Sequence, residues 1–218
     1  MGLDFAVVPG FFGVLLTGAG WTVAITLCAG ILSFFGGIVF AVVALYGHWA
    51  LRLPMRGFAF LFMGTPLLLQ LFLIYFGLIE IGIDLPAFVA GVIGLGLHFA
   101  VYNSELIQAS ILAVDKGQYE GARTLGLSRG QALRRIVIPQ AVRAVTPPMG
   151  NNMIALLKDS ALVSVIGVME LTLAAQQAIS RTYRPFEFYL AAAFCYYIIN
   201  LALEAGLRHL ERRNAASR

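Results

Sequence analysis

Ionisable and amide side chains inside apolar stretches are the residues of this sequence that could do chemistry. Glu105, Lys158, Asp159 and Glu170 each interrupt a hydrophobic run. An ionisable group in the middle of a membrane costs about 2.5–3.5 kcal/mol on insertion scales, so each of them needs a reason to be there. Two readings stay open: these groups line a polar path for a zwitterionic solute, or they lie at interfaces and cross-link helices. The candidate path comprises Gln70, Asn103, Glu105, Asn151, Lys158 and Asp159.

Other chemistries lack the residues that they require. His48, His98 and His209 stand apart, and no His-x-x-x-His or Cys-x-x-Cys spacing occurs, so we expect no metal site. No glycine-rich phosphate loop ends in Lys-Ser or Lys-Thr, and a partner must therefore supply any ATP hydrolysis, with no cofactor on this chain. An intramembrane enzyme would need a Ser/His or paired-Asp constellation, which is missing. Cys28 and Cys195 lie in apolar runs and are expected to pack as ordinary small residues.

The composition predicts an all-α integral membrane protein. Hydrophobic residues make up 60% of the 218 residues and charged residues 12%, and the mean hydropathy is +0.84. A chain of this length holds five or six spans of about 20 residues and leaves no room for a soluble catalytic domain. The net charge of +4 comes from basic residues that cluster where hydrophobic segments end. This distribution indicates membrane topology rather than nucleic-acid binding.

The apolar runs predict one transmembrane domain with five spans. No formal charge occurs from Phe5 to Leu51, but a continuous helix of that length would run about 70 Å, so we expect breaks at Pro9-Gly10 and at residues 17–20. A kink or late start is expected at Gly64-Thr65-Pro66, and another kink at Pro147-Pro148. Short, Gly/Pro-interrupted apolar segments of this kind indicate a transport pathway. The predicted spans are about 21–46, 58–79, 86–112, 140–166 and 188–207.

The basic residues predict which side of the membrane each loop faces. Arg52 and Arg56 are assigned to a first turn, six basic residues lie from Lys116 to Arg143, and four lie in the C-terminal tail, which gives twelve on one side. The other side holds only Arg181 and Arg184. Since Lys and Arg favour the cytoplasmic side, the N-terminus is expected outside and the C-terminus in the cytoplasm.

A polar interruption at residues 115–139 separates two apolar halves and predicts two short helices joined by a hinge. Tyr119, Ala122 and Leu125 would share one face of the first helix, and Gly126 would end it. A capping box would begin the second helix, since Ser128 is followed three residues later by Gln131. Pro139 is expected to end that second helix.

The spacing within this interruption resembles that of a known family. Glu120-Gly121-Ala122, Gly126 and Ile136, followed by Ile138-Pro139, is similar to the signature cytoplasmic loop of permeases in ATP-driven (ABC) importers. Gly121 stands where alanine is usual in that family, and Ile138 where leucine is usual. The resemblance implies a coupling helix that seats in a groove of the ATPase subunit. The implied coupling residues are Glu120, Gly121, Ala122, Arg123 and Gly126.

The stretch from Gly64-Thr65-Pro66 to Gly77 resembles the polar amino acid branch of these importers, of the histidine, glutamine and arginine type, although Met63 replaces a usual arginine. The resemblance covers roughly residues 12–212. It implies the five-span core of type I, MetI-like permeases in a bacterial inner membrane. The implied partners are an ATPase dimer that carries ATP and Mg²⁺, a second identical or homologous permease chain, and an extracytoplasmic amino-acid-binding protein. The alternative is an ion- or proton-coupled secondary transporter that uses Glu105 or Asp159.

Overall fold

A computed structural model describes residues 2–216, so Arg218 of the basic tail lies outside the described residues. Within that range the chain folds into helices and contains no strand. In chain order they are the 3-10 helix η1 (Phe5–Phe11), α1 (Phe12–Tyr46), α2 (Trp49–Gly64), α3 (Leu67–Phe72), the π-helix η2 (Leu73–Gly77), the 3-10 helix η3 (Ile79–Ile81), α4 (Ala87–Leu112), α5 (Lys116–Thr124), α6 (Arg129–Ala132), the π-helix η4 (Leu133–Val137), α7 (Ile138–Asp159), the 3-10 helix η5 (Ser160–Ile166), α8 (Leu171–Thr182) and α9 (Pro185–Ala216).

Helix α1 is continuous over 35 residues, or about 52 Å at 1.5 Å per residue. The expected break at residues 17–20 is therefore wrong, and α1 begins before the predicted first span of about 21–46. Pro9 does lie outside α1, within η1. Gly18 serves close packing instead of a turn: a Cβ atom there would come within 2.7 Å of the Ala174 Cβ. Small residues at helix contacts allow this kind of approach in membranes.

The second predicted span is a bent pair of helices. Helix α2 begins at Trp49, so Arg52 and Arg56 lie inside a helix and not in the predicted turn. The turn falls at Gly47 instead, where a Cβ atom would meet the Val43 carbonyl oxygen at 2.4 Å. The chain bends by 116° between α2 and the segment Leu67–Ile81, across the expected kink before Pro66. The preference of the residue before proline for extended backbone accounts for the break.

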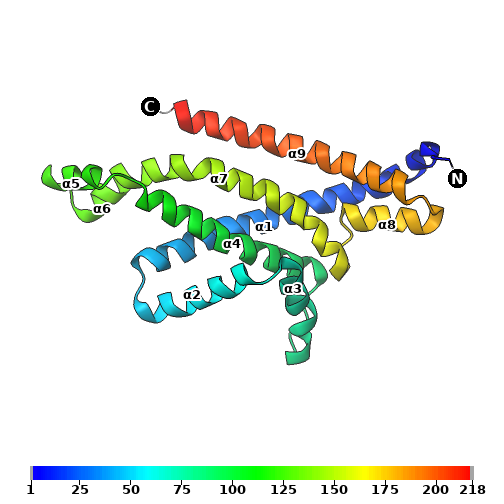
Figure 1. Cartoon of the computed structure of the whole chain (residues 1–218), viewed down its shortest axis with the longest axis horizontal. Coiled ribbons are helices and arrows are strands. Elements are labelled where there is room, and N and C mark those ends of the chain that lie inside the picture. The colour runs from blue at the N-terminus through cyan, green and yellow to red at the C-terminus, as the bar shows by residue number, and fades with distance from the viewer. Residues whose placement is uncertain (1, 217–218) are drawn as a thin grey trace.

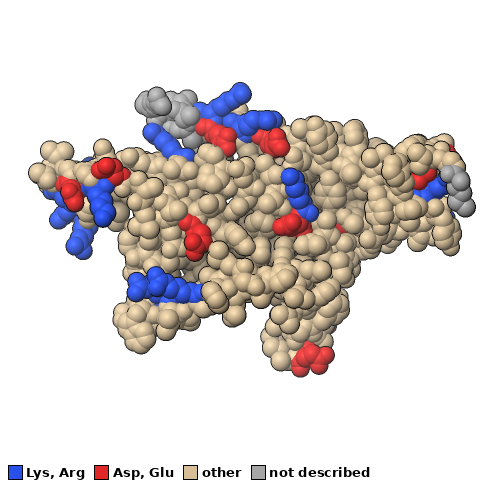
Figure 2. Space-filling model, viewed as in Figure 1, with Lys and Arg blue, Asp and Glu red and all other residues tan. Residues whose placement is uncertain are grey.

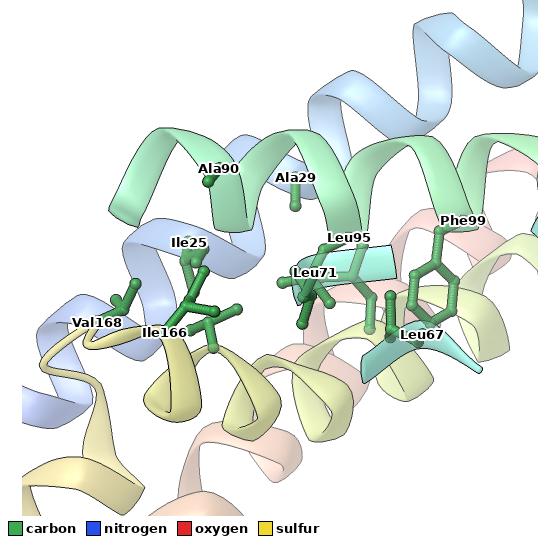
Figure 3. Packing of buried hydrophobic residues seen from close by; sticks show 11 residues of the cluster. Ile25, Ala29, Leu67, Leu71, Ala90, Leu95, Phe99, Ile166 and Val168 are labelled. Atoms are coloured by element: carbon green, nitrogen blue, oxygen red, sulfur yellow. The ribbon is translucent and has the colours of Figure 1, made fainter. Parts of the chain in front are cut away.

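Helix α4 forms the centre of the fold and coincides with the third predicted span. Figure 1 shows it between α2 and α7, with α1 running behind it. Its buried residues pack with those of α1, α3 and the α7–η5 segment, as Figure 3 shows for most of the cluster. The buried cluster is Ile25, Ala29, Leu67, Leu71, Ala90, Leu95, Phe99, Leu156, Val163, Ile166 and Val168.

Helices α6, η4 and α7 follow one another without a gap from Arg129 to Asp159. The prediction that Pro139 ends a helix is wrong, because Pro139 lies in the first turn of α7. Proline lacks an N–H group and its ring crowds the carbonyl four residues earlier. The chain accommodates this by loosening into a π-helix, in which the Ile138 N–H donates to the Leu133 carbonyl oxygen. The expected fourth span, about 140–166, corresponds to α7 with its internal prolines followed by η5.

The last two helices form a hairpin beside the N-terminus. Arg181 lies inside α8, in its last helical turn, and not in the predicted connection between spans. Helix α9 runs from Pro185 to Ala216 and so extends beyond the predicted span of about 188–207 at both ends. The N-terminal segment is tied to this hairpin, since the Glu187 carboxylate accepts from the Asp4 N–H at 2.9 Å and Arg184 donates to the Gly2 carbonyl oxygen at 2.8 Å. The N-terminus and α8 lie at one end of the molecule, and α5, α6 and the C-terminal half of α9 at the other (Figure 1).

Three helical segments among the described residues are long and apolar enough to cross a membrane: Phe5–Tyr46, Ala87–Leu112 and Pro185–Arg212. The bent pair Trp49–Gly64 and Leu67–Ile81 qualifies when taken together. Helix α7, which contains Pro147 and Pro148, does not qualify by composition.

Candidate functional site

Residues 115–132, which we term the polar corner, are shaped by hydrogen bonds between near neighbours. Asp115 caps α5 by accepting from the Gly117 N–H at 2.6 Å. Gly126 adopts a φ of 86°, and the Leu127 N–H bonds the Ala122 carbonyl oxygen, which closes the helix end. Ser128 and Gln131 then form the predicted capping box. The prediction of two short helices with a hinge is confirmed.

The Arg123 side chain spans this hinge. Its Nη1 atom donates to the Leu127 carbonyl oxygen at 2.6 Å, so the guanidinium bonds the chain on the far side of Gly126. A hydrogen bond from a charged donor is about twice as strong as a neutral one. Arg123, which the sequence placed among the coupling residues, thus helps to fix the angle between α5 and α6.

The residues of α5 divide into inward and outward groups. Ala122 is buried, while Glu120, Gly121 and Arg123 are exposed. The prediction that Leu125 shares the inner face with Ala122 is wrong, because Leu125 is 84% exposed. The reason is that α5 ends at Thr124, so Leu125 leaves the helical register. An apolar side chain at an exposed tip is a candidate anchor for a partner protein, and sequence periodicity assigned it to the wrong face.

Gln70, a predicted path residue, is buried at the break between α2 and α3. Its side-chain amide donates to the Phe62 carbonyl oxygen at 2.7 Å and to the Thr65 carbonyl oxygen at 3.0 Å. Its Oε1 atom lies 3.0 Å from Nδ1 of His98 on α4. The amide satisfies backbone groups that the bend leaves without helical partners. His98 was an isolated histidine in the sequence, and no sequence signal paired it with Gln70.

Asn103 is buried where α1, α4 and α7 meet. Its Nδ2 atom lies 3.3 Å from Ser33 Oγ, and its Oδ1 atom accepts from Asn152 Nδ2 at 2.9 Å. Asn103 thereby links three helices that are distant in the sequence. Its neighbour across the bond is Asn152, the residue after the predicted Asn151.

The remaining predicted path residues lie at the surface of the single chain. Glu105, Asn151 and Lys158 are exposed, and Asp159 is half-buried. Asn151 and Lys158 are seven residues apart on α7 and so share one helix face. Ion pairs form between Arg184 and Glu187 and between Arg208 and Glu204, whereas Lys158 and Asp159 do not pair with each other. The chain alone does not enclose a path around these groups.

Glu170 belongs to a buried polar junction outside the predicted path. It caps α8 by accepting from the Leu173 N–H at 3.0 Å, and its other oxygen accepts a short hydrogen bond from the Tyr196 hydroxyl. Thr22 of α1 accepts from the Leu171 N–H at 3.1 Å in the same region. These bonds join α1, α8 and α9, which favours the cross-linking reading for Glu170.

Charged side chains are unevenly distributed over the molecule. On the face that Figure 2 shows, Lys and Arg gather at the end that carries the polar corner and along the C-terminal half of α9, while the projection formed by α3, η2 and η3 ends in acidic residues. Within residues 2–216, no three His, Cys, Asp or Glu side chains come together in a way that could hold a metal ion.

Comparison with known proteins places this architecture. Residues 33–215 match the family described as "Binding-protein-dependent transport system inner membrane component". The chain is 36% identical to the arginine ABC transporter permease protein ArtQ of Haemophilus influenzae, over 93% of this chain and 94% of that protein. It is 37% identical to the probable amino-acid ABC transporter permease protein PatM of Vibrio harveyi, over 90% of each chain.

Solved structures agree with these sequence relatives. A chain of an amino acid ABC transporter crystallised with histidines matches with a TM-score of 0.91 and 38% identity, over 98% of this chain and all of that chain. The MetNI methionine ABC transporter matches with a TM-score of 0.75 at 19% identity, which shows the shared MetI-like fold. The polar corner and the bent helix pair thus occur in a fold already known from permeases, and the chain belongs to the family of binding-protein-dependent transport system inner membrane components.

Proposed function

We propose that this chain is the permease subunit of an ATP-driven importer that translocates a polar amino acid delivered by an extracytoplasmic binding protein. The observation that carries the proposal is the polar corner, an exposed and internally bonded projection that continues into α7. The family match supports an ATPase and a binding protein as partners. The arginine and amino-acid permeases named above support a polar amino acid as the solute.

The polar corner is the docking element for the ATPase in this proposal. Glu120 and Leu125 project outward and contact the ATPase groove, and Gly121 leaves room for close approach because nothing lies within 4 Å of a Cβ atom there. Ala122, Arg123 and Gly126 hold the corner in shape. This chain has no catalytic site and no cofactor, and ATP and Mg²⁺ belong to the ATPase.

Two permease chains, identical or homologous, enclose the path. The exposed groups Glu105, Asn151, Lys158 and Asp159 then face a shared space, while Gln70 and Asn103 hold the helices that form its walls. ATP binding closes the ATPase dimer and draws the two polar corners together. The continuous segment from α6 to α7 passes this displacement to the Asn152–Asn103 bond and thus to α4.

The protein is a multi-pass inner-membrane protein, and in our proposal its N-terminus is outside and its C-terminus in the cytoplasm. The corner and the C-terminal half of α9 lie at one end of the molecule and the N-terminus at the other (Figure 1). An ATPase can reach the corner only from the cytoplasm. The basic residues gathered at this end support the same orientation.

The test is co-purification of the tagged chain with a co-expressed candidate ATPase, comparing wild type with Glu120→Arg. Glu80→Arg, a charge reversal at an exposed residue of η3, is the matched control. We expect the ATPase to accompany the wild type and the control, and Glu120→Arg to lose it or to keep it without transport-linked hydrolysis. If no ATPase accompanies any of the three while solute still crosses reconstituted vesicles, the chain is a secondary transporter.

A further inference from the structure

A cleft of about 460 Å³ lies between α1, α4, α7 and α9. Its walls come from the second half of α1, the second half of α4, residues 138–153 of α7 and the tail part of α9. All four segments lie toward the end of the molecule that carries the polar corner (Figure 1). In the orientation proposed above, this apolar cleft opens within the cytoplasmic half of the membrane.

The walls of the apolar cleft are suited to hydrocarbon. They are formed mainly by aliphatic and aromatic side chains, among them Phe34, Ile107 and Val142. Asn103 and Asn152 reach the cleft, but they are bonded to each other, and Asn103 also bonds Ser33. An occupant of the deep part therefore gains by burying apolar surface rather than by hydrogen bonding.

The volume of the cleft suits a small occupant. At about 460 Å³ it falls in the range of pockets that hold small ligands. A single flexible acyl chain can follow the apolar walls of such a cleft.

Basic side chains stand next to the residues that line the cleft. Arg134 and Arg135 are exposed and lie three and four residues before the lining residue Ile138. On the opposite wall, next to the lining residues Leu207 and Leu210, Arg212 is exposed, and Arg208 is exposed and paired with Glu204. Each Lys or Arg near an anionic membrane surface favours binding by about fivefold. This end of the cleft thus complements a negatively charged headgroup.

We infer that the apolar cleft is a binding site for one anionic phospholipid of the cytoplasmic leaflet. An acyl chain occupies the space between α1, α4, α7 and α9, and Arg134 and Arg135 hold the phosphate. The bound lipid fills the gap between α9 and the rest of the bundle. Only 6% of the apolar stretch of α9 is buried. The lipid couples the position of α9 to that of α7, which continues from the polar corner.

The experiment measures phosphatidylglycerol retained by the purified full-length chain, in its complex with the ATPase where one forms. Protein is reconstituted in phosphatidylcholine nanodiscs with or without phosphatidylglycerol and then extracted. Native mass spectrometry measures the phosphatidylglycerol that remains bound to it. Val142→Trp fills the cleft from an exposed wall position, and Val39→Trp is the control on an exposed face of α1 outside the cleft. Arg134→Gln with Arg135→Gln removes the headgroup contacts, and Arg52→Gln with Arg56→Gln is the charge-matched control.

We expect Val142→Trp to reduce retained phosphatidylglycerol about tenfold, because excluding two methylene groups has an effect of that size. The Arg134/Arg135 pair should reduce it about fivefold per arginine, and both controls should match wild type. Equal retention in Val142→Trp and Val39→Trp overturns the inference. A change from dimer to monomer in Val142→Trp without loss of lipid overturns it as well, because the cleft is then an interface between copies. Retention needs no transport, so the proposed function is tested separately.

Discussion

The polar corner and the helix bundle are held together over very different distances along the chain. In the corner, Arg123 bonds Leu127, four residues away, and Ser128 bonds Gln131, three residues away. In the bundle, Asn103 bonds a residue 49 positions away, and Leu171 bonds Thr22 across 149 positions. A corner built from local bonds keeps its shape when the bundle rearranges. This is the property that a docking element needs.

The two regions also use glycine in opposite ways. Gly126 in the corner has a φ of 86°, a backbone conformation that other residues adopt with strain. Gly18 in α1 has ordinary helical backbone, and its lack of a side chain lets α1 pack closely against α8. Substitution should therefore damage local shape at the first position and helix packing at the second.

The largest effect is expected where one helix packs against the backbone of another. Gly18→Leu would force a side chain into Ala174 and the backbone of Leu171, at a cost of about 3 kcal/mol. Thermal unfolding in detergent should show a markedly lower melting temperature. Gly20→Leu is the control, because nothing lies within 4 Å of a Cβ atom there. Equal melting temperatures for the two variants would contradict the role of Gly18 in packing.

The buried junction of Glu170 comes next. Tyr196→Phe removes the hydroxyl that donates to the Glu170 carboxylate, and the uncompensated acceptor should cost about 1–3 kcal/mol. Tyr197→Phe, at an exposed neighbour, should leave the melting temperature unchanged. In a Tyr196→Phe, Glu170→Gln double mutant the two losses should be less than additive. Strict additivity would mean that the pair does not act as one unit.

A smaller and purely local effect is expected in the corner. Gly126→Ala should strain the hinge by about 1–2 kcal/mol, since its φ of 86° is unfavourable for any residue with a Cβ atom. Co-purified ATPase should fall while the melting temperature of the bundle stays the same. The control Gly130→Ala, in α6, should bind ATPase as wild type, because this helical position has open space around a Cβ atom. A lower melting temperature for Gly126→Ala would show that the corner is not independent.

The smallest effect separates helix linkage from solute contact. Asn103→Ala should lower the stability by about 0.6 kcal/mol for each of its two bonds, the average for hydrogen bonds between membrane helices, with little change in the KM for uptake. Glu105→Ala, at an exposed residue two positions on, should change the KM and leave the melting temperature alone. The reverse pattern would place Asn103 in the path and Glu105 in the scaffold.

Much of this architecture was predictable because it depends on local signals. The third span, the kink before Pro66, the αL position of Gly126 and the capping box of Ser128 all follow from backbone preferences of a few adjacent residues. The errors arose where packing overrides such preferences. Residues 17–20 stay helical because α8 packs there, and Pro139 is absorbed by a π-helix in place of a helix end.

The candidate site was predictable in composition but not in arrangement. Sequence patterns selected Glu120 and Arg123, yet they gave Leu125 the wrong face, since the helix ends one residue earlier than periodicity implied. The same patterns selected Gln70 and Asn103 as polar groups in apolar runs. Their partners His98 and Asn152 come from other helices, and a single sequence does not show which residues of distant helices pair.

The sequence by itself determined that this chain is a helical membrane protein with a polar docking corner, because hydropathy, charge distribution and capping act within a few residues of one another. Only the tertiary structure decided which polar groups form hydrogen bonds inside the protein and which are left exposed. Asn103 and Glu170 are bonded within the bundle, while Glu105 and Lys158 are exposed. The reason is that hydrogen-bond partners and burial depend on how distant helices pack, and no local preference encodes that contact.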